Sequence, residues 1–405
     1  MAKAALNAAR MKERNYRRFL RELRVNPMTR SQMARIMGIT RSSTSLIAED
    51  MLSTGIITEG PLSQDGKNTT KALSWSKDYF HVAGINLGRD TITTGLTDFC
   101  GNIFDFISFP SSDCSSPKQA LDRAAQYITQ MIATHKPSGK LLGIGVASPG
   151  PLDIKAGVIM DPPYFDLFHN TPVAQHLRQI FKCDVVLEND ANSLALAEKC
   201  YGLTDSYERF LELMVDMGIG ASLILDNKLH KGPTGFGNGF GHTSIDINGP
   251  RCVCGNNGCV EMYASIPCIV ETAKAVDPSL NSWRVIVDRA YADDRVALDI
   301  MHTEARYLAT VIVNASNVLD IQAVIFSGDY VLYRPTMLLE LIESEVNKRV
   351  TSRGERTIEI LPSQIPSEPK VLACINLAIE KYLERPFIFS NPTHSPEDIE
   401  ETVNA

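Results

Sequence analysis

Three cysteines and a histidine form the most chemically specific pattern in the sequence. His242 is followed by Cys252, Cys254 and Cys259, so four side chains with metal-ligating atoms lie close together along the chain. Three thiolates and one imidazole complete a tetrahedral zinc set and leave no coordination position open. The spacing therefore predicts a structural Zn2+ site. The alternative is a group of reduced core cysteines beside an unrelated histidine.

A second group of residues, near the start of the chain, could read DNA. Arg41, Ser42, Ser43 and Ser45 follow one another closely at the expected start of a helix. Cationic and short hydroxyl side chains in such a place can reach base edges and phosphates in the major groove. Lys67, in a segment expected to connect two short strands, is the fifth candidate DNA contact.

Three amphipathic helices are expected to carry these contacts. Residues 11–23 form the first helix. Thr29 and Gln32 have the spacing of a capping box at the start of the second helix, which should end at Gly38. Thr40 can cap the third helix. The residues expected to face inward are Tyr16, Phe19, Leu20, Leu23, Met33, Ile36, Met37, Leu46, Ile47, Met51 and Leu52.

Two helices joined by a tight glycine turn are typical of a helix-turn-helix. Short strand-like runs at residues 56–58 and 72–75 flank residues 63–68, whose Asp-Gly pair favours a hairpin turn. The sequence therefore predicts a winged helix-turn-helix DNA-binding domain over residues 1–78. The alternative is a three-helix packing module whose arginines form a solvated face.

The remaining chain has the pattern of an α/β protein. Strand-like runs alternate with helical segments, and the length suits two similar lobes around a cleft. We expect a first α/β lobe at residues 79–190, a second with the zinc site at 191–390, and a flexible tail at 391–405. No close internal sequence repeat is found. The strands are expected at 81–87, 91–98, 141–146, 184–187 and 210–215, with helices at 117–134 and 191–201.

Charge and composition limit the class of protein. Residues 1–60 contain 11 Lys and Arg against 5 Asp and Glu, although the whole chain has a net charge of -7. A basic N-terminal segment on an acidic chain suits a separate DNA-binding domain. The 44% hydrophobic content excludes a disordered chain. No apolar run approaches the roughly 20 residues needed to span a bilayer, so we expect a cytoplasmic protein without membrane insertion.

Three motifs resemble the repressor, open-reading-frame and kinase (ROK) family. They are the glycine-rich stretch at 143–150, the segment Glu188-Asn189-Asp190-Ala191-Asn192, and Gly241-His242 leading into a Cys-x-Cys-Gly-x-x-Gly-Cys-x-Glu stretch that ends at Glu261. The resemblance covers nearly the whole chain. It implies a two-lobed, actin-like (ribonuclease-H-like) ATPase-type sugar kinase fold that closes over a sugar. Members with an added winged helix are repressors.

The resemblance also implies roles for single residues. Asp190 corresponds to the aspartate that acts as general base in the family's kinases. Asn189, His242 and Glu261 correspond to residues that contact the sugar, and His242 would also ligate zinc. In isolation, Asn189 and Asp190 would be interpreted as a capping pair before a helix.

Departures from the kinase motifs argue against ATP binding. Residues 86–90 are Asn-Leu-Gly-Arg-Asp, whereas the family's kinases have a motif similar to Asp-x-Gly-Gly-Thr. A carboxylate and a glycine of that motif are therefore missing here. Asp216 places a negative charge in the second phosphate loop. Ser327-Gly328-Asp329 departs more weakly from the adenosine-side Gly-Gly pair. Gly239 stands where the family has a sugar-binding glutamate, which indicates a different or smaller sugar.

We therefore expect a transcriptional regulator, with a repressor favoured over an activator, that binds operator DNA and senses a sugar or sugar derivative between its lobes. A homodimer or homotetramer is expected, since paired recognition helices suit a near-palindromic operator. Catalysis is not expected. The alternatives are an ATP-dependent sugar kinase with Asp190 as its catalytic residue, and a protein-interaction module whose lobes bind another protein.

Overall fold

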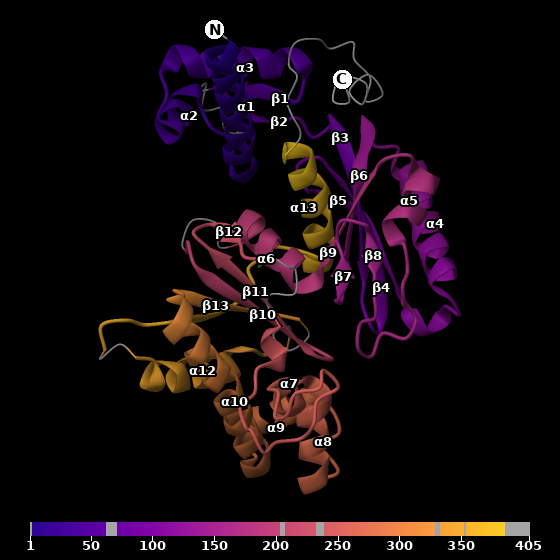
Figure 1. The fold of residues 1–405 in the computed structure, drawn as a ribbon, viewed down its shortest axis with the longest axis vertical. Coiled ribbons are helices and arrows are strands. Elements are labelled where there is room, and N and C mark those ends of the chain that lie inside the picture. Colours follow the sequence, from indigo (N-terminus) through magenta and orange to yellow (C-terminus); the bar gives the residue numbers. More distant parts are fainter. Residues whose placement is uncertain are drawn as a thin grey trace.

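The computed structural model describes residues 2–61, 71–202, 207–231, 239–328, 333–351 and 354–384 (Figure 1). Lys67, the turn at 63–68, Asn238, Asp329 and the tail at 391–405 lie outside these ranges. The described residues form an N-terminal unit and a body that contains two five-stranded sheets. None of the described helices is long and apolar enough to cross a membrane.

The first part is an N-terminal unit of three helices and a two-stranded antiparallel sheet. Thr29 and Gln32 form the predicted capping box, and Gly38 ends the second helix with a φ of 66°. Thr40 caps the third helix through the backbone N–H of Ser43. The elements are α1 (Ala2–Val25), α2 (Arg30–Met37), α3 (Arg41–Thr54), β1 (Ile57–Pro61) and β2 (Lys71–Trp75).

Two residues expected inside this unit lie at its surface. Leu46 is 69% exposed and Ile36 is 40% exposed. On α3 the buried stripe uses Thr44 and Ala48 beside Ile47, and the Thr44 hydroxyl donates to the Thr40 carbonyl oxygen at 3.0 Å. A hydroxyl that is hydrogen-bonded within its own helix can be buried at little cost, so the apolar Leu46 was not needed on the inner face.

The body contains two five-stranded mixed sheets with the same connectivity. In each, the first strand pairs antiparallel with the second and parallel with a later strand, and the order is β5-β4-β3-β6-β9 in one and β12-β11-β10-β13-β14 in the other. The topology thus repeats although no close sequence repeat was found. The strands are β3 (Phe80–Leu87), β4 (Thr91–Asp98), β5 (Ile103–Pro110), β6 (Lys140–Ser148), β9 (Asp184–Asn189), β10 (Phe210–Val215), β11 (Ile219–Leu225), β12 (Lys228–Leu229), β13 (Ala323–Ser327) and β14 (Glu359–Pro362), beside the small pair β7 (Leu152–Asp153) and β8 (Val158–Ile159).

Helices cover both sheets. Helices α4 and α5 lie on one side of the first sheet, and α10 and α12 pack beside the second (Figure 1). The helices of the body are α4 (Pro117–His135), α5 (Val173–Phe181), α6 (Asp190–Tyr201), α7 (Glu261–Ala264), α8 (Ile266–Val276), α9 (Trp283–Tyr291), α10 (Arg295–Leu319), α12 (Thr336–Arg349) and α13 (Pro369–Glu384), with short 3-10 turns η1 (Ser111–Asp113) and η2 (Phe240–His242).

Helix α13 returns to the first sheet from the end of the chain (Figure 1). It packs on β3 and β6, although residues 191–390 were expected to form the second lobe. Small residues permit this contact: a Cβ at Gly145 would lie 1.7 Å from the Cys374 carbonyl oxygen, and one at Gly95 would lie 2.3 Å from a Val371 methyl. The first lobe is therefore built from two separate stretches of chain.

The three largest buried clusters of the described residues differ in what they join. One lies within the second lobe and one between the first sheet and α4. The third joins the N-terminal unit to the first lobe through Trp75, Phe99 and the α13 residues Ile375 and Ile379. Trp75 stacks on Phe99 with ring centroids 4.3 Å apart. The N-terminal unit is thus packed against the body and not merely tethered to it.

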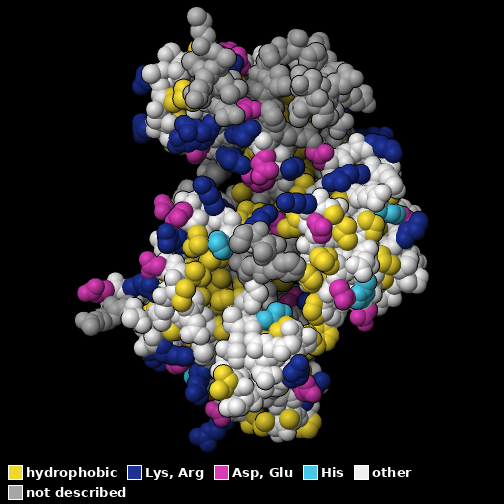
Figure 2. Space-filling view, viewed as in Figure 1, with side chains coloured by type: hydrophobic (Ala, Val, Ile, Leu, Met, Phe, Trp, Pro, Cys, Tyr) yellow, Lys and Arg dark blue, Asp and Glu magenta, His cyan; other side chains and the backbone are white. Residues whose placement is uncertain are grey.

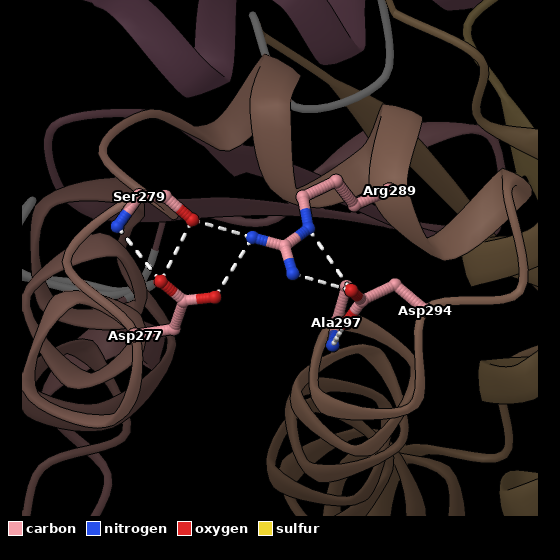
Figure 3. Close-up of polar contacts among 5 residues, drawn as sticks. All are labelled: Asp277, Ser279, Arg289, Asp294 and Ala297. Carbon is pink, nitrogen blue, oxygen red and sulfur yellow. Dashed lines mark hydrogen bonds and ion pairs between the residues drawn. The ribbon is translucent and has the colours of Figure 1, made fainter.

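Arg289 ties three helices of the second lobe (Figure 3). Its guanidinium donates to Asp277 at the end of α8 and to Asp294, the N-cap of α10, over 2.8 and 3.1 Å. Hydrogen bonds from Ser279 and the Arg289 charge lower the pKa of Asp277 to about 2. This network fixes the ends of α8 and α10 relative to α9.

Candidate functional site

The four predicted metal ligands converge in the second lobe. Ligand atoms of His242, Cys252, Cys254 and Cys259 all lie within 4.8 Å of one another. The Cys252 Sγ and His242 Nδ1 atoms are 3.6 Å apart, as are the sulfurs of Cys254 and Cys259. These distances match the edges of a zinc tetrahedron, which are about 3.5–3.8 Å for bonds of 2.0–2.3 Å. The donor set fits a tetrahedral metal ion.

The loop around the cluster is folded tightly enough to hold these atoms in place. Gly258 has a φ of 64°, and a Cβ there would lie 1.7 Å from the Asp246 carbonyl oxygen. Burial raises the pKa of the Cys259 thiol to about 12, whereas the backbone N–H of Asn256 lowers the pKa of Cys254. A metal ion that binds such thiols displaces their protons into solvent and holds the sulfurs as thiolates.

His242, a predicted metal ligand, and Glu261, a predicted sugar contact, are connected through one strand. Glu261 is the first residue of α7, and its Oε2 accepts a hydrogen bond from the Ile219 backbone N–H at 2.8 Å. Gly241, next to His242, packs directly on the Ile219 carbonyl. The start of β11 therefore positions both the cluster and the Glu261 carboxylate.

Asn189 and Asp190 lie at the junction of β9 and α6. Asn189 is the N-cap of α6 and accepts from the Asn192 N–H at 3.2 Å. Asp190 Oδ1 accepts from the Ala191 N–H and from Asn189 Nδ2, both at 2.9 Å. Asn189 thus has the capping role of the alternative interpretation, whereas Asp190 is the first helical residue and its Oδ2 accepts no hydrogen bond from another described residue. Burial raises the pKa of the Asp190 carboxyl, an effect that the Ala191 N–H and the charge of Arg89 oppose.

Arg89 is the site residue that the sequence did not identify as a contact. It lies in the turn between β3 and β4, and its side chain reaches the second lobe: a Cβ at Gly218 would meet Glu261 Oε2 at 2.7 Å and Arg89 Nη1 at 3.4 Å. The guanidinium also donates from Nε to the Pro163 carbonyl oxygen at 3.2 Å. Asp190, Arg89 and Glu261 therefore approach one another between the lobes. An arginine in place of a phosphate-loop glycine was the available signal.

The two former phosphate loops are the β3–β4 and β10–β11 turns. Arg89 fills the first with a side chain that crosses to the second. In the second, the Asp216 carboxylate accepts from the Met217 N–H at 3.0 Å. An arginine and a carboxylate thus lie in the two turns that the resemblance aligns with phosphate loops, and a carboxylate repels an anionic phosphate.

Gly239, which replaces the expected sugar-binding glutamate, precedes η2 and is exposed. A Cβ built on it meets no described atom within 4 Å, and its φ is -67°. A larger residue would fit among the described residues, so packing does not require glycine. The missing carboxylate is consistent with a difference in ligand.

The candidate DNA contacts on α3 differ in exposure and in whether their side chains already make hydrogen bonds within the helix cap. Arg41 and Ser42 are exposed at the start of α3, whereas Ser45 is half-buried. The hydroxyls of Ser42 and Ser43 lie 3.0 and 2.8 Å from Thr40 Oγ1, within the helix cap. Lys and Arg side chains are visible on the described surface of the N-terminal unit (Figure 2). Arg41 is therefore the freest of the predicted contacts, and exposed Leu46 is an apolar neighbour that the sequence placed inside.

Comparison with known proteins places these features in a family. The model of the ROK family matches residues 82–380. A xylose repressor from Bacillus subtilis (strain 168) is 28% identical over 380 residues, which cover 92% of this chain and 97% of that protein. A glucokinase from Thermotoga maritima is 25% identical over 314 residues, covering 74% of this chain and 98% of the kinase.

Solved structures have the same fold. A crystal structure described as a ROK family transcriptional regulator, homologous to the Escherichia coli MLC protein, matches with a TM-score of 0.77 at 20% identity. The match covers 92% of this chain and 98% of that one. It extends over the N-terminal unit as well as the two lobes, whereas the matched glucokinase accounts for a shorter part of the chain.

Proposed function

The chain belongs to the ROK family, and on that premise we propose that it is a DNA-binding transcriptional repressor of carbohydrate-metabolism genes that a sugar releases from its operator. The observation that carries the proposal is the combination of parts: a helix–turn–helix unit with exposed Arg41 precedes two lobes between which Arg89 lies near both Asp190 and Glu261. The xylose repressor aligns across both parts.

The direct test is selection of genomic fragments by the purified protein at near-physiological salt, followed by sequencing of the retained DNA. Enrichment of a near-palindrome beside genes for carbohydrate uptake or breakdown supports the proposal and supplies the operator. Retention without sequence preference, abolished by modest salt, refutes specific DNA reading. A homodimer would present its two α3 helices to half-sites about one duplex turn apart.

Replacing Arg41 with alanine should weaken operator binding about tenfold or more, in line with the roughly 1–3 kcal/mol that a base- or phosphate-binding arginine contributes. Sugar affinity should stay unchanged, since Arg41 is on α3 and the sugar site is between the lobes. Fluorescence anisotropy with the selected operator measures the first, and calorimetry the second. Arg306→Ala, which removes an exposed arginine of α10, is the matched control. Equal operator affinity for the Arg41→Ala protein and the wild type would exclude the contact.

For the effector, we propose a neutral sugar held by Asn189, Asp190, Glu261 and His242. Carboxylate and amide groups suit the hydroxyls of a polyol. Arg89 adds hydrogen-bond donors, because its Nη1 lies beside Gly218 close to the Glu261 carboxylate. D-Xylose is the first sugar to test, because the relative with 28% identity is a xylose repressor. A pentose also suits the absence of a carboxylate at Gly239.

We further propose that the cysteine–histidine cluster holds one structural Zn2+. The bound ion would offset most of the charge of the three thiolates and fix the loop that carries His242. This assignment depends on reduced thiols, which together with an operator target favours a cytoplasmic location. Zinc does not take part in any proposed chemical step.

An ATP-dependent sugar kinase is the second candidate, favoured by Asp190 and by the glucokinase relative. The Arg89 side chain and the Asp216 carboxylate oppose it. A coupled ADP-release assay with D-xylose and D-glucose distinguishes the two. Sustained, sugar-dependent ADP release that Asp190→Ala abolishes would establish the kinase, whereas we expect no turnover.

A further inference from the structure

One buried arginine connects the N-terminal unit to the helix that begins at the sugar site. Arg24, on the last turn of α1, has a side chain that is only 3% exposed. Long cationic side chains are rarely buried this completely unless they are paired. Its partners come from α6 and α13, which lie in different parts of the chain.

The Arg24 guanidinium makes a specific set of contacts. Nη1 donates to Glu380 Oε1 of α13 at 3.0 Å and lies 3.7 Å from the Cys200 sulfur of α6. Nη2 donates to the Tyr201 hydroxyl at 2.5 Å, and the guanidinium carbon lies 4.9 Å from the centre of that ring. On its other side, 5.7 Å away, is the ring of Trp75 in β2. The hydrogen bond to Tyr201 thus joins α1 and β2 to the last residue of α6.

The other end of α6 is the candidate sugar site. Asn189 caps the helix, and Asp190 is its first residue. The helix has 12 residues, so it extends about 18 Å from Asp190 to Tyr201 at 1.5 Å per residue. It has few places to bend, because seven of its residues, from Ala191 to Glu198, are buried. A displacement at Asp190 is therefore passed on to Tyr201 largely undiminished.

Helix α6 also packs against both lobes. It packs on α13, which belongs to the first lobe, and on β11 of the second sheet. On the side of the second sheet, the Ser222 hydroxyl of β11 donates to Asn192 Oδ1 of α6 at 2.8 Å. On the other side, Ser363 and the Gln364 N–H donate to the Glu198 carboxylate at 2.7 and 3.2 Å, just before α13. A change in the angle between the lobes must therefore shift α6 against α13.

We propose that the Arg24–Tyr201 contact is the coupling joint through which sugar binding at the first turn of α6 changes the position of the DNA-binding unit. The inference rests on the proposed repressor function and names its internal regulation. In the sugar-free state the contact holds α1 and β2 in the arrangement that binds the operator. When the lobes close on a sugar, α6 moves relative to α13. Arg24 cannot then keep both Tyr201 and Glu380, and the operator-binding arrangement loses stability relative to the released one.

Tyr201→Phe is the main test, because it removes only the hydroxyl and leaves the ring under the Arg24 guanidinium. Arg24→Lys keeps the buried charge beside Glu380 but removes the planar pair of donors. Arg21→Ala is the matched control. Arg21 donates to the same Glu380 at 2.9 Å from the same helix, and it makes no hydrogen bond to a described residue of α6. Thermal unfolding and circular dichroism of each full-length variant check that it is folded.

The measured quantity is the ratio of operator Kd values with and without saturating sugar, using whichever of D-xylose, D-glucose and N-acetylglucosamine releases the wild type. Allosteric ratios are usually about 5–150-fold. We expect the ratio to fall to less than about threefold in Tyr201→Phe and Arg24→Lys, and to stay at the wild-type value in Arg21→Ala. By linkage, the effect of operator DNA on sugar affinity must fall by the same factor. A merely structural role would lower the operator affinity equally with and without sugar, so the ratio of the two operator Kd values would not change.

The double variant provides a further check. If Arg24 and Tyr201 act through one contact, combining the two substitutions should reduce the ratio no further than either alone. Folded Tyr201→Phe and Arg24→Lys proteins that sugar releases as effectively as the wild type would overturn the coupling joint while leaving the repressor function intact. A wild type that binds a specific operator but responds to none of the sugars would instead refute the proposed sugar control, and with it this inference.

Discussion

A Cys254→Ser protein is expected to lose its metal and to have a less stable second lobe. Structural zinc sites contribute about 10–16 kcal/mol of apparent binding free energy in small zinc domains, so losing one of four ligands should cost about 3 kcal/mol, or roughly a hundredfold in zinc affinity. Cys254 is exposed, unlike Cys252 and Cys259, so its substitution disturbs the apolar packing least. Native mass spectrometry gives the zinc content and guanidinium unfolding gives the stability.

Cys268→Ser is the control for this experiment. Cys268 lies on α8 in the same lobe, is half-buried and is not a member of the cluster. It should keep one zinc ion and nearly wild-type stability. The loss should extend to sugar binding in the Cys254→Ser protein, because the loop that carries His242 packs on Ile219, whose N–H holds Glu261. A Cys254→Ser protein that is equally stable and responds to sugar without bound metal would refute the structural zinc assignment.

An Asp190→Ala protein is expected to remain bound to its operator at sugar concentrations that release the wild type. Hydrogen bonds to a charged group contribute about 1.5–3 kcal/mol each, so losing two sugar hydroxyl contacts should weaken sugar binding by a hundredfold or more. Operator affinity without sugar should not change, because Asp190 is at the far end of α6 from the N-terminal unit. Titration of the operator complex with sugar, read by anisotropy, measures both quantities.

The same residue predicts the direction of the pH dependence. Burial raises the pKa of Asp190, and only its charged form is a full-strength acceptor for sugar hydroxyls. Sugar affinity should therefore be complete above that raised pKa and should fall as the pH drops through it, earlier than for an ordinary aspartate. Asp190→Asn should abolish this pH dependence. Asp299→Ala, at an exposed position of α10, is the control, and a wild-type response to sugar in Asp190→Ala would refute the assigned contact.

Local patterns in the sequence predicted the turn between α2 and α3 and the clustering of three cysteines with one histidine, whereas the first helix, expected at 11–23, is longer and spans Ala2–Val25. The capping box at Thr29, the helix end at Gly38 and the strands at 91–98 and 210–215 were predicted to within a residue. Each depends on interactions between residues close together in the chain. The same holds for His242, Cys252, Cys254 and Cys259, which a tight loop brings together.

The second lobe expected at 191–390 was wrong in one respect, because α13 packs on the first sheet. The other predictions that failed involved choices between faces of a helix. Leu46 was placed inside because it is apolar, and Thr44 was not considered because it is polar. The structure reverses the two, since the Thr44 hydroxyl is satisfied by the Thr40 carbonyl within the helix. A hydrophobic pattern alone does not contain that hydrogen bond, and an exposed leucine on a helix proposed to bind DNA is available for an apolar contact with a thymine methyl group.

The sequence by itself thus determined the cysteine–histidine cluster, the helix–turn–helix spacing and the motifs of the ROK family, because each of these lies within a short stretch of chain. Only the tertiary structure decided which distant residues meet: that α13 returns to the glycine-lined face of the first sheet, that Arg89 crosses to Gly218 and Glu261, and that Arg24 joins α1 to the end of α6. The physical reason is that such contacts depend on how whole elements pack. In the sequence, Arg24 is one of several charges on a basic helix. Its burial becomes evident only in the folded chain, where partners more than 170 residues away lie beside it.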